Sequence, residues 1–270
     1  SAVDKFLIKN KKFNGSISFL ITGDEEGLAI NGTKKVVDYL KKRKEKIDFC
    51  IVGEPTNPNK LGEMIKIGRR GSLSGVIEIS GSQGHVAYPH LSNNPINTLV
   101  NICKKLKEKK LDAGNKNFQP SNLEFTSIDV DNKAHNVIPA RAKAQFNIRY
   151  NNHHNSVTLK RKINLVVRNI CKNNNCKFKI DFTVNGDSFL TKPNKTIFMA
   201  KNIIKRVTKV TPKFSTTGGT SDARFIRKIS PCLEFGLVNK TMHKVDECVS
   251  LNDLKKLTKI YQNILQDYFK

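Results

Sequence analysis

The chain has 270 residues, 38% of them hydrophobic, and a formal net charge of +25 at pH 7. This length is enough for two domains of ordinary size, and the mean hydropathy of -0.44 is that of a soluble globular chain. No apolar run is long enough to span a bilayer, and the first residues lack the apolar core of a signal peptide. We therefore expect a cytoplasmic protein without a membrane partner.

The strongly basic composition raises the question of nucleic acid. The lysines are spread over the whole chain, and runs such as Lys41–Lys44 fall on the polar faces or ends of predicted helices. We interpret them as solvated faces and expect no nucleic-acid partner. A basic, non-catalytic binding module stays open as an alternative, which a steep salt dependence of DNA binding would favour. The six cysteines lack the paired spacing of a metal site, so we expect free thiols.

The first part of the chain has the order of a parallel sheet. Ser16–Thr22 reads as a buried strand, and the acidic turn Asp24-Glu25-Glu26-Gly27 follows it. A helix begins at Thr33, and a second buried strand covers Ile47–Val52. Strand, helix and strand with short links predict a parallel sheet whose carboxyl edge carries the acidic turn.

The pattern changes after residue 70. Hydrophobic residues alternate with polar ones in four segments, which predicts an antiparallel sheet with one solvated face. Two amphipathic helices lie between these segments. The predicted strands are Gly71–Gly81, Leu123–Val130, Ala142–Tyr150 and Lys177–Val184, and the helices are Ile96–Lys110 and Val157–Cys171. Residues 71–185 are therefore expected to form an inserted α+β domain with a four-stranded antiparallel sheet and two helices.

The last part returns to the first pattern. The expected elements are a helix over Lys195–Thr208, a helix opened by Ser221-Asp222, a strand over Pro231–Gly236 and a helix over Asn252–Phe269. A Gly/Thr-rich loop, Ser215–Thr220, precedes the second of these. The sequence thus predicts an α/β protein, with a mainly parallel sheet flanked by helices in residues 1–70 and 186–270.

Three carboxylates and one imidazole are candidates for chemistry. Glu26 follows the first predicted strand, Glu54 follows the second, and His243 lies in a loop after a later one. Mixed O/N ligand sets of this kind suit zinc, and the adjacent Glu25 could remain free as a proton acceptor. A solvated surface turn stays open as the other interpretation of the acidic residues. His153 and His154 lie among asparagines and are expected in an exposed turn.

With these residues in view, the sequence resembles the dinuclear zinc amidohydrolases of the M20 peptidase family. The matching motifs run in the family's order over nearly the whole chain. They are Thr22–Gly27, Gly53–Thr56, Gly68–Ser72, Gly84–His90, Asn136–Ala140, Ser215–Phe225, Glu234–Gly236 and His243–Val245. The resemblance implies hydrolysis of a succinyl amide on a small substrate with several carboxylates. Other deacylases of the family, such as acetylornithine deacetylase or an aminoacylase, stay open.

The resemblance also implies a role for each matching position. Glu25 would be the general acid/base, and His85 would act in the active site of a partner subunit, in a homodimer formed through the inserted domain. Glu26, Glu54 and His243 would bind two zinc ions, or zinc and cobalt. The residues implied to hold the substrate are Arg69, Ser72, Tyr88, Asn136, Arg149, Gly219, Thr220 and Asn239.

One departure concerns the start of the chain. Family members carry a His-x-Asp motif and a metal-bridging aspartate ahead of these motifs, and no histidine precedes His85 here. We therefore expect an N-terminally truncated form whose parallel sheet is incomplete at its N-terminus. Such a form would not assemble the two-metal centre and would have little activity by itself.

Overall fold

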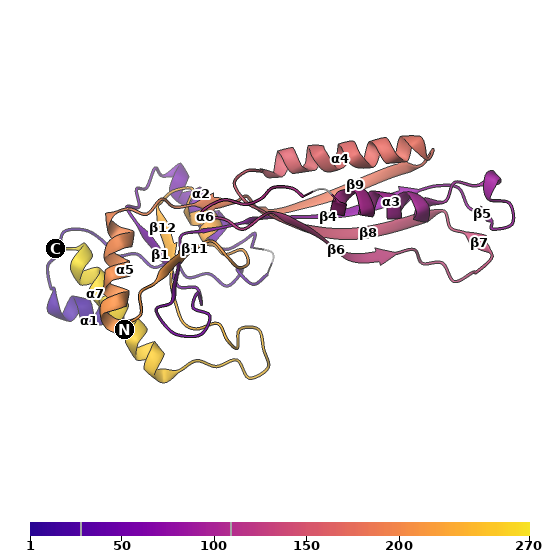
Figure 1. The fold of residues 1–270 in the computed structure, drawn as a ribbon. Coiled ribbons are helices and arrows are strands. Elements are labelled where there is room, and N and C mark those ends of the chain that lie inside the picture. Colours follow the sequence, from indigo (N-terminus) through magenta and orange to yellow (C-terminus); the bar gives the residue numbers. More distant parts are fainter. Residues whose placement is uncertain (28, 109) are drawn as a thin grey trace. The chain divides into compact units, whose positions relative to one another are not determined.

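The computed structural model describes residues 1–27, 29–108 and 110–270, which form two compact units (Figure 1). Unit 1 combines Ser1–Arg69 with Leu190–Lys270, and unit 2 consists of Arg70–Phe189. The insert expected at residues 71–185 lies within unit 2. No helix in these described ranges has the length and apolar content needed to cross a membrane.

Unit 1 is built on a small mixed sheet. Its strands are β1 (Cys50–Val52), β2 (Met64–Lys66), β11 (Lys213–Ser215) and β12 (Cys232–Glu234), in the order β1-β12-β2-β11. The β1–β12 and β2–β11 pairs are parallel, and β12 pairs with β2 in the antiparallel sense. The expected mainly parallel sheet is confirmed, although β2 and β11 were not predicted.

Helices surround this sheet. They are α1 (Ala2–Lys9), α2 (Thr33–Lys42), α5 (Lys195–Thr208), α6 (Ala223–Ile226) and α7 (Leu251–Tyr268). The Asn194 side chain caps α5 by accepting the Ile197 N–H, and the Ser250 hydroxyl caps α7. Apolar side chains of α5 and α7 join those of the central strands in one core. The helices expected at Lys195–Thr208 and Asn252–Phe269 are therefore confirmed.

The expected first strand is wrong. Residues 16–22 form no strand, and Phe19 and Ile21 are 71% and 88% exposed. A strand is stabilised by a partner that takes its backbone hydrogen bonds and covers its apolar side chains. No strand in the described part of the chain pairs with this segment. Its apolar run therefore lacks the contacts that would make it a strand.

Unit 2 matches the predicted insert. The long strands β4 (Gly71–Ser80), β6 (Asn122–Asp129), β8 (Arg141–Tyr150) and β9 (Lys177–Gly186) form an antiparallel sheet in the order β6-β8-β4-β9. Helices α3 (Pro95–Glu108) and α4 (Ser156–Asn173) cover one face (Figure 1). The apolar residues of the alternating pattern form one core with apolar residues of these helices. Helix α3 was predicted to end at Lys110, and that prediction includes Lys109, which lies outside the described residues.

Short elements complete the chain. Strand β5 (Gly84–His85) pairs with β7 (Val137–Ile138), and a 3₁₀ turn, η1 (Pro89–Leu91), follows β5. Strand β3 (Gly68–Arg69) pairs with β10 (Phe189–Leu190) close to the two points where the chain passes between the units. Because β5 and β7 follow the outer ends of long strands, the His85 segment lies at one extremity of unit 2.

Candidate active site

The carboxylate of Asp24, the first acidic residue of the turn, holds the turn together through backbone hydrogen bonds. One carboxylate oxygen of Asp24 accepts the backbone N–H groups of Ile30 and Asn31, at 2.5 and 2.6 Å. The bond from Asn31 is the largest cause that lowers the pKa of Asp24. Asp24 is thereby fixed as a structural anion, and the next two residues of the turn, Glu25 and Glu26, are left for other contacts.

Glu25 has the electrostatic setting of a proton acceptor. Partial burial raises the pKa of its carboxyl group, and the neighbouring charges of Glu26 and Asp222 raise it further. A carboxylate whose pKa is shifted towards neutrality takes and returns a proton more readily near pH 7 than an ordinary glutamate does. The structure therefore leaves Glu25 suited to general acid/base chemistry.

Glu54 lies at the carboxyl end of β1, beside the buried Glu234. Burial is the main cause that raises the pKa of Glu54 to about 7, and the charges of Glu234 and Glu25 add to it. The chain approaches closely here, because a Cβ atom on Gly236 would lie 2.3 Å from the Glu54 carbonyl oxygen. Only glycine at position 236 lets the end of β12 pack against the turn that carries Glu54.

Glu26 and His243 lie near each other on the surface. Their Oε2 and Nε2 atoms are 3.9 Å apart, and both side chains are largely exposed. His243 has a φ of +59°, a left-handed conformation that is uncommon outside glycine, and its N–H donates to Glu247. The strained turn places the imidazole beside the acidic turn, which the sequence separates from it by more than two hundred residues.

The chemistry of these donors fits a divalent cation. Carboxylate oxygen together with imidazole nitrogen is a ligand set that zinc accepts, and the crowded carboxylates that raise the pKa values of Glu25 and Glu54 call for a positive charge. The described residues nevertheless contain no cluster of three or more His, Cys, Asp or Glu side chains arranged to hold a metal. The structure brings Glu26 and His243 together, but among the described residues these two and Glu54 do not form such a cluster.

Arg69 does not have the free guanidinium of a surface substrate ligand. It is 7% exposed, and its Nε donates to both carboxylate oxygens of Glu234 at 3.0 Å. Its Nη1 donates to the Gly219 carbonyl at 3.2 Å. Gly219 itself is exposed, and Thr220 is partly exposed. Arg69 therefore contacts the glycine-rich loop from its buried side, whereas Gly219 and Thr220 lie on its solvent side.

Two buried charged residues of this region were given no role from the sequence, although Glu234 lies in one of the matching motifs. Lys66 is 6% exposed and Glu234 is 1% exposed. Lys66 donates to the Thr217 carbonyl in the glycine-rich loop, and Glu234 accepts from the Ser221 hydroxyl just after it. Charged residues in short strands give no signal of burial, because their partners lie far away in the chain. Asn239 is partly exposed at the start of the His243 turn, where its N–H donates to the Asn57 carbonyl.

In unit 2 the predicted residues form two groups. His85, Tyr88 and Asn136 lie together and are exposed, with the rings of His85 and Tyr88 centred 6.0 Å apart. The Asn136 carbonyl accepts the Val86 N–H, and the Ala87 N–H donates to Nδ1 of His85. With Nδ1 used as an acceptor, neutral His85 carries its proton on Nε2 and can donate it.

The second group lies at the opposite end of β4. Ser72 is 2% exposed, and its hydroxyl accepts a hydrogen bond from Asn147. Arg149 pairs with Ser72 across the strands, and burial lowers the pKa of its guanidinium. Since β4 continues from Ser72 to Ser80, roughly 26 Å at about 3.3 Å per residue separates this group from the start of the His85 segment.

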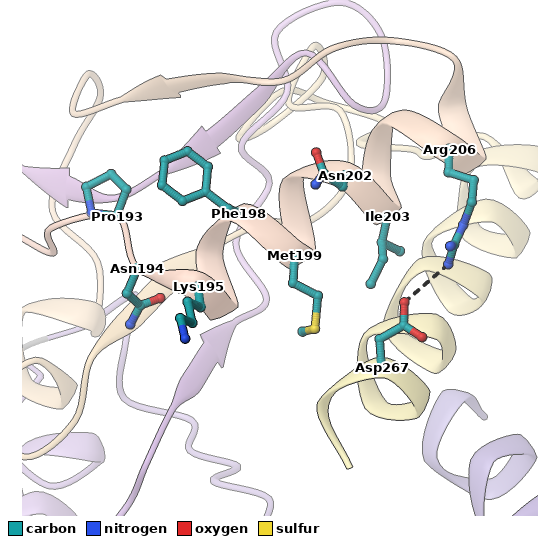
Figure 2. Close-up of a pocket in the computed structure, with 9 residues that line it drawn as sticks. All are labelled: Pro193, Asn194, Lys195, Phe198, Met199, Asn202, Ile203, Arg206 and Asp267. Atoms are coloured by element: carbon teal, nitrogen blue, oxygen red, sulfur yellow. Dashed lines mark ion pairs between the residues drawn. The ribbon is translucent and has the colours of Figure 1, made fainter. Parts of the chain in front are cut away.

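A hollow of about 770 Å³ lies along α5 (Figure 2). Phe198, Met199 and Ile203 line it, together with the 3.5 Å ion pair between Arg206 and Asp267. None of the residues predicted to act in chemistry or substrate binding borders it. The candidate active site is therefore the edge of the unit 1 sheet.

The family model of peptidase family M20/M25/M40 matches residues 1–267. The chain belongs to this family. Among its M20/M25/M40 relatives, a succinyl-diaminopimelate desuccinylase of Pelagibacter ubique (strain HTCC1062) is 65% identical over 268 residues, which cover 99% of this chain and 70% of the relative. A succinyl-diaminopimelate desuccinylase of Parvibaculum lavamentivorans is 47% identical over 274 residues, which cover 100% of this chain and 69% of the relative.

Solved structures support the same fold. The crystal structure of aminopeptidase PepT from Bacillus cereus ATCC 10987 superposes with a TM-score of 0.80 at 17% identity, over 100% of this chain and 68% of that one. Human carnosine dipeptidase 1 gives a TM-score of 0.65 at 15% identity, over 88% of this chain and 63% of that one. At these identities the likeness shows a shared fold alone.

Proposed function

We propose that this chain belongs to an enzyme that catalyses the metal-dependent hydrolysis of N-succinyl-L,L-2,6-diaminopimelate to succinate and L,L-diaminopimelate, a step in the formation of diaminopimelate and lysine. The observation that carries the proposal is the 65% identity, over 99% of the chain, with a protein named succinyl-diaminopimelate desuccinylase. The crowded carboxylates Glu25, Glu26 and Glu54, with His243 beside Glu26, support a hydrolytic site.

Glu25 is the proton carrier in this proposal. Its raised pKa suits it to take a proton from the attacking water as the water oxygen bonds to the succinyl carbonyl carbon. When the C–N bond breaks, Glu25 returns that proton to the amine nitrogen. The products are then diaminopimelate with a free amino group and succinate, whose new carboxyl group loses the second proton of the water as it ionises, and Glu25 is ready for the next cycle.

Glu26, Glu54 and His243 are the residues that would hold zinc, in a centre of two zinc ions or of zinc and cobalt. When bound, such ions supply positive charge that acidifies the attacking water and stabilises the developing oxyanion. The same charge would relieve the repulsion that raises the pKa of Glu54. Removal of metal by a chelator is therefore expected to abolish turnover.

His85 would serve the site of a partner subunit in a homodimer. Its Nε2–H is directed by the Ala87 contact to act as a donor, which suits an oxyanion. Tyr88 and Asn136 accompany it at the same extremity of unit 2. Gly219, Thr220, Asn239 and Arg149 would contact the carboxylates of the substrate, and Arg69 and Ser72 would support them from buried positions.

The direct test is turnover of N-succinyl-L,L-diaminopimelate with zinc, followed by release of free amine. The product of the complete reading frame and residues 1–270 are assayed side by side. Replacing Glu25 by Gln is expected to reduce kcat by at least about 100-fold, because the general base is lost. N-acetylornithine and N-acetyl amino acids serve as competing substrates. Faster turnover of these than of the succinyl compound would refute the proposed substrate and favour another deacylase.

A further inference from the structure

The glycine-rich loop of unit 1 lies on two buried cations. The ammonium group of Lys66 donates to the carbonyl and the hydroxyl of Thr217, at 2.8 and 2.5 Å. Arg69 donates to the Gly219 carbonyl at 3.2 Å. Both cationic side chains are almost fully buried, at 6% and 7% exposure. The carbonyls of Thr217 and Gly219, on either side of Gly218, are therefore held towards the protein interior.

Gly218 is the residue that lets the loop approach these cations. Its φ is +100°, a conformation that side chains with a Cβ atom rarely adopt. A Cβ atom at this position would lie 2.7 Å from Nη1 of Arg69 and 3.8 Å from Nζ of Lys66. The backbone thus passes directly over both charged groups.

The direction of the carbonyls fixes the direction of the neighbouring N–H groups. Every peptide bond in the described ranges is trans, and in a trans peptide the C=O and the following N–H point in opposite directions. Because the carbonyls of Thr217 and Gly219 point at the cations, the N–H groups of Gly218 and Thr220 point away from them. Throughout the described chain, neither N–H donates to a protein acceptor.

The outer side of the loop is open. Gly218 and Gly219 are exposed, and a Cβ atom on Gly219 would meet nothing within 4 Å. Two backbone donors thus face free space, with a positive charge behind them. Outward backbone N–H groups of a turn are a recurrent anion-binding arrangement.

The ammonium group of Lys66 forms no ion pair in the described part of the chain. Glu234 forms an ion pair with Arg69, and its other contact is the Ser221 hydroxyl. Lys66 has no carboxylate within ion-pair distance among the described residues. Burial, followed by the charge of Arg69, lowers the pKa of Lys66 to about 8, although the charge of Glu234 acts to raise it, so the ammonium form still predominates at pH 7. An ammonium group without an ion pair of its own among the described residues therefore lies beneath the two outward N–H groups.

We propose that Lys66 is a positioning residue that makes this loop select a carboxylate of the substrate. It holds the Thr217 carbonyl inwards, which aims the Gly218 N–H outwards, and it supplies the charge that favours an anion over a neutral group of the same shape. The proposal rests on the proposed function, because it concerns one of the carboxylates of the substrate. The group that occupies the loop is a carboxylate, bound through backbone N–H donors.

The test measures binding without turnover. Isothermal titration calorimetry on metal-free protein compares N-succinyl-L,L-diaminopimelate with three analogues, each of which has one carboxylate replaced by a carboxamide. The wild-type protein is expected to prefer the parent over at least one analogue by about 10-fold, the difference between a charged and a neutral hydrogen-bond acceptor. In Lys66→Met, that preference should fall to within about 2-fold, while the other two analogues keep their wild-type ranking.

Two further variants serve as controls. Lys201→Met also removes one lysine charge from unit 1. The Lys201 ammonium lies over the Phe214 ring and not at the glycine-rich loop, so this variant should keep the wild-type preference for the parent compound. Gly219→Ala adds a methyl group to the open side, so it should weaken binding of the parent without lowering the melting temperature. Melting curves establish that Lys66→Met is folded.

A wild-type preference that persists unchanged in Lys66→Met overturns the inference, as does the absence of any preference in the wild-type protein. The proposed function is decided separately by turnover of the parent compound in zinc-loaded protein. Turnover with an unaltered preference in Lys66→Met contradicts the role of Lys66 alone. A Lys66-dependent preference without turnover contradicts the hydrolase assignment alone.

Discussion

Glu234 and Arg69 form an ion pair whose side chains are 1% and 9% exposed. Removing two charges from water is costly, and the cost is offset only where hydrogen bonds satisfy both partners. Here the carboxylate accepts from the guanidinium and from the Ser221 hydroxyl, and the guanidinium also donates to loop carbonyls. Hydrogen bonds thus satisfy both charged groups. The loss of either partner would leave the other charge buried and unpaired.

Replacing Arg69 by Met is expected to lower the free energy of unfolding by about 3–5 kcal/mol, because Glu234 stays buried without its cation. The double variant Arg69→Met with Glu234→Leu should lose less than Arg69→Met alone, since no unpaired charge remains. Urea denaturation of both variants and of Glu234→Leu completes a double-mutant cycle. Additive losses from the two single variants would contradict a coupled pair.

At the level of elements, long periodic segments could be predicted from the sequence and short ones could not. The α5 helix has the predicted bounds, Lys195–Thr208, because its apolar residues repeat over almost four turns and Asn194 caps it. Strands β2 and β11 have three residues each, too few for a periodicity to show. Residues 16–22 have the composition of a strand, but composition does not provide a partner strand.

The candidate site shows the same limit. Glu25, Glu26, Glu54 and His243 could be singled out because acidic residues and an imidazole follow predicted strands. The burial of Lys66 could not, since its contacts come from a loop 151 positions away. The interpretation of His154 as exposed was wrong: its ring is 7% exposed and lies 3.2 Å from Asp112, on a distant loop.

Asp112 joins that loop to the turn between β8 and α4. Burial acts to raise the pKa of Asp112, but hydrogen bonds, first that from Ser121, more than offset it and hold the pKa at about 2. Its carboxylate also accepts the Asn151 amide at 2.5 Å. A lowered carboxyl pKa contributes stability that is present above the unfolded value of about 3.8 and is lost as pH falls towards 2.

Replacing Asp112 by Ala should lower the free energy of unfolding of unit 2 by about 1–3 kcal/mol at pH 7, because buried donors lose their acceptor. The difference from wild type should shrink as pH falls from 3.8 to about 2. Denaturation monitored at several pH values measures both effects. Asp181→Asn, at an exposed position on β9, is the control and should change little. An equal loss in the two variants would contradict the structural role of Asp112.

The end of β12 offers a test of how the Glu54 turn is positioned. Replacing Gly236 by Ala places a methyl group 2.3 Å from the Glu54 carbonyl, so the turn must shift. We expect a loss of about 1–3 kcal/mol in unfolding free energy and weaker zinc binding. Gly23→Ala is the matched control, because its Cβ atom would meet nothing within 4 Å. Wild-type zinc affinity in Gly236→Ala would show that Glu54 does not depend on this packing.

In the whole molecule, the position of His85 bears on whether it acts in the active site of its own subunit or in that of a partner subunit. The long β4 strand carries His85 away from Ser72 and Arg149 within its own unit. A residue placed at such an extremity is suited to act on a second copy of the chain. In the proposed homodimer, each active site would combine Glu25 of one subunit with His85 of the other, so neither subunit would complete a site alone.

Mixing two inactive variants tests this arrangement. Glu25→Gln and His85→Ala are each expected to lack turnover as homodimers. After the subunits are exchanged at equal concentrations, half of the dimers are mixed, and each mixed dimer has one intact site out of two. Activity should therefore rise to about a quarter of the wild-type value. If His85 instead acts within its own subunit, every site in the mixture carries one defect and turnover stays absent, although size-exclusion chromatography still shows a dimer.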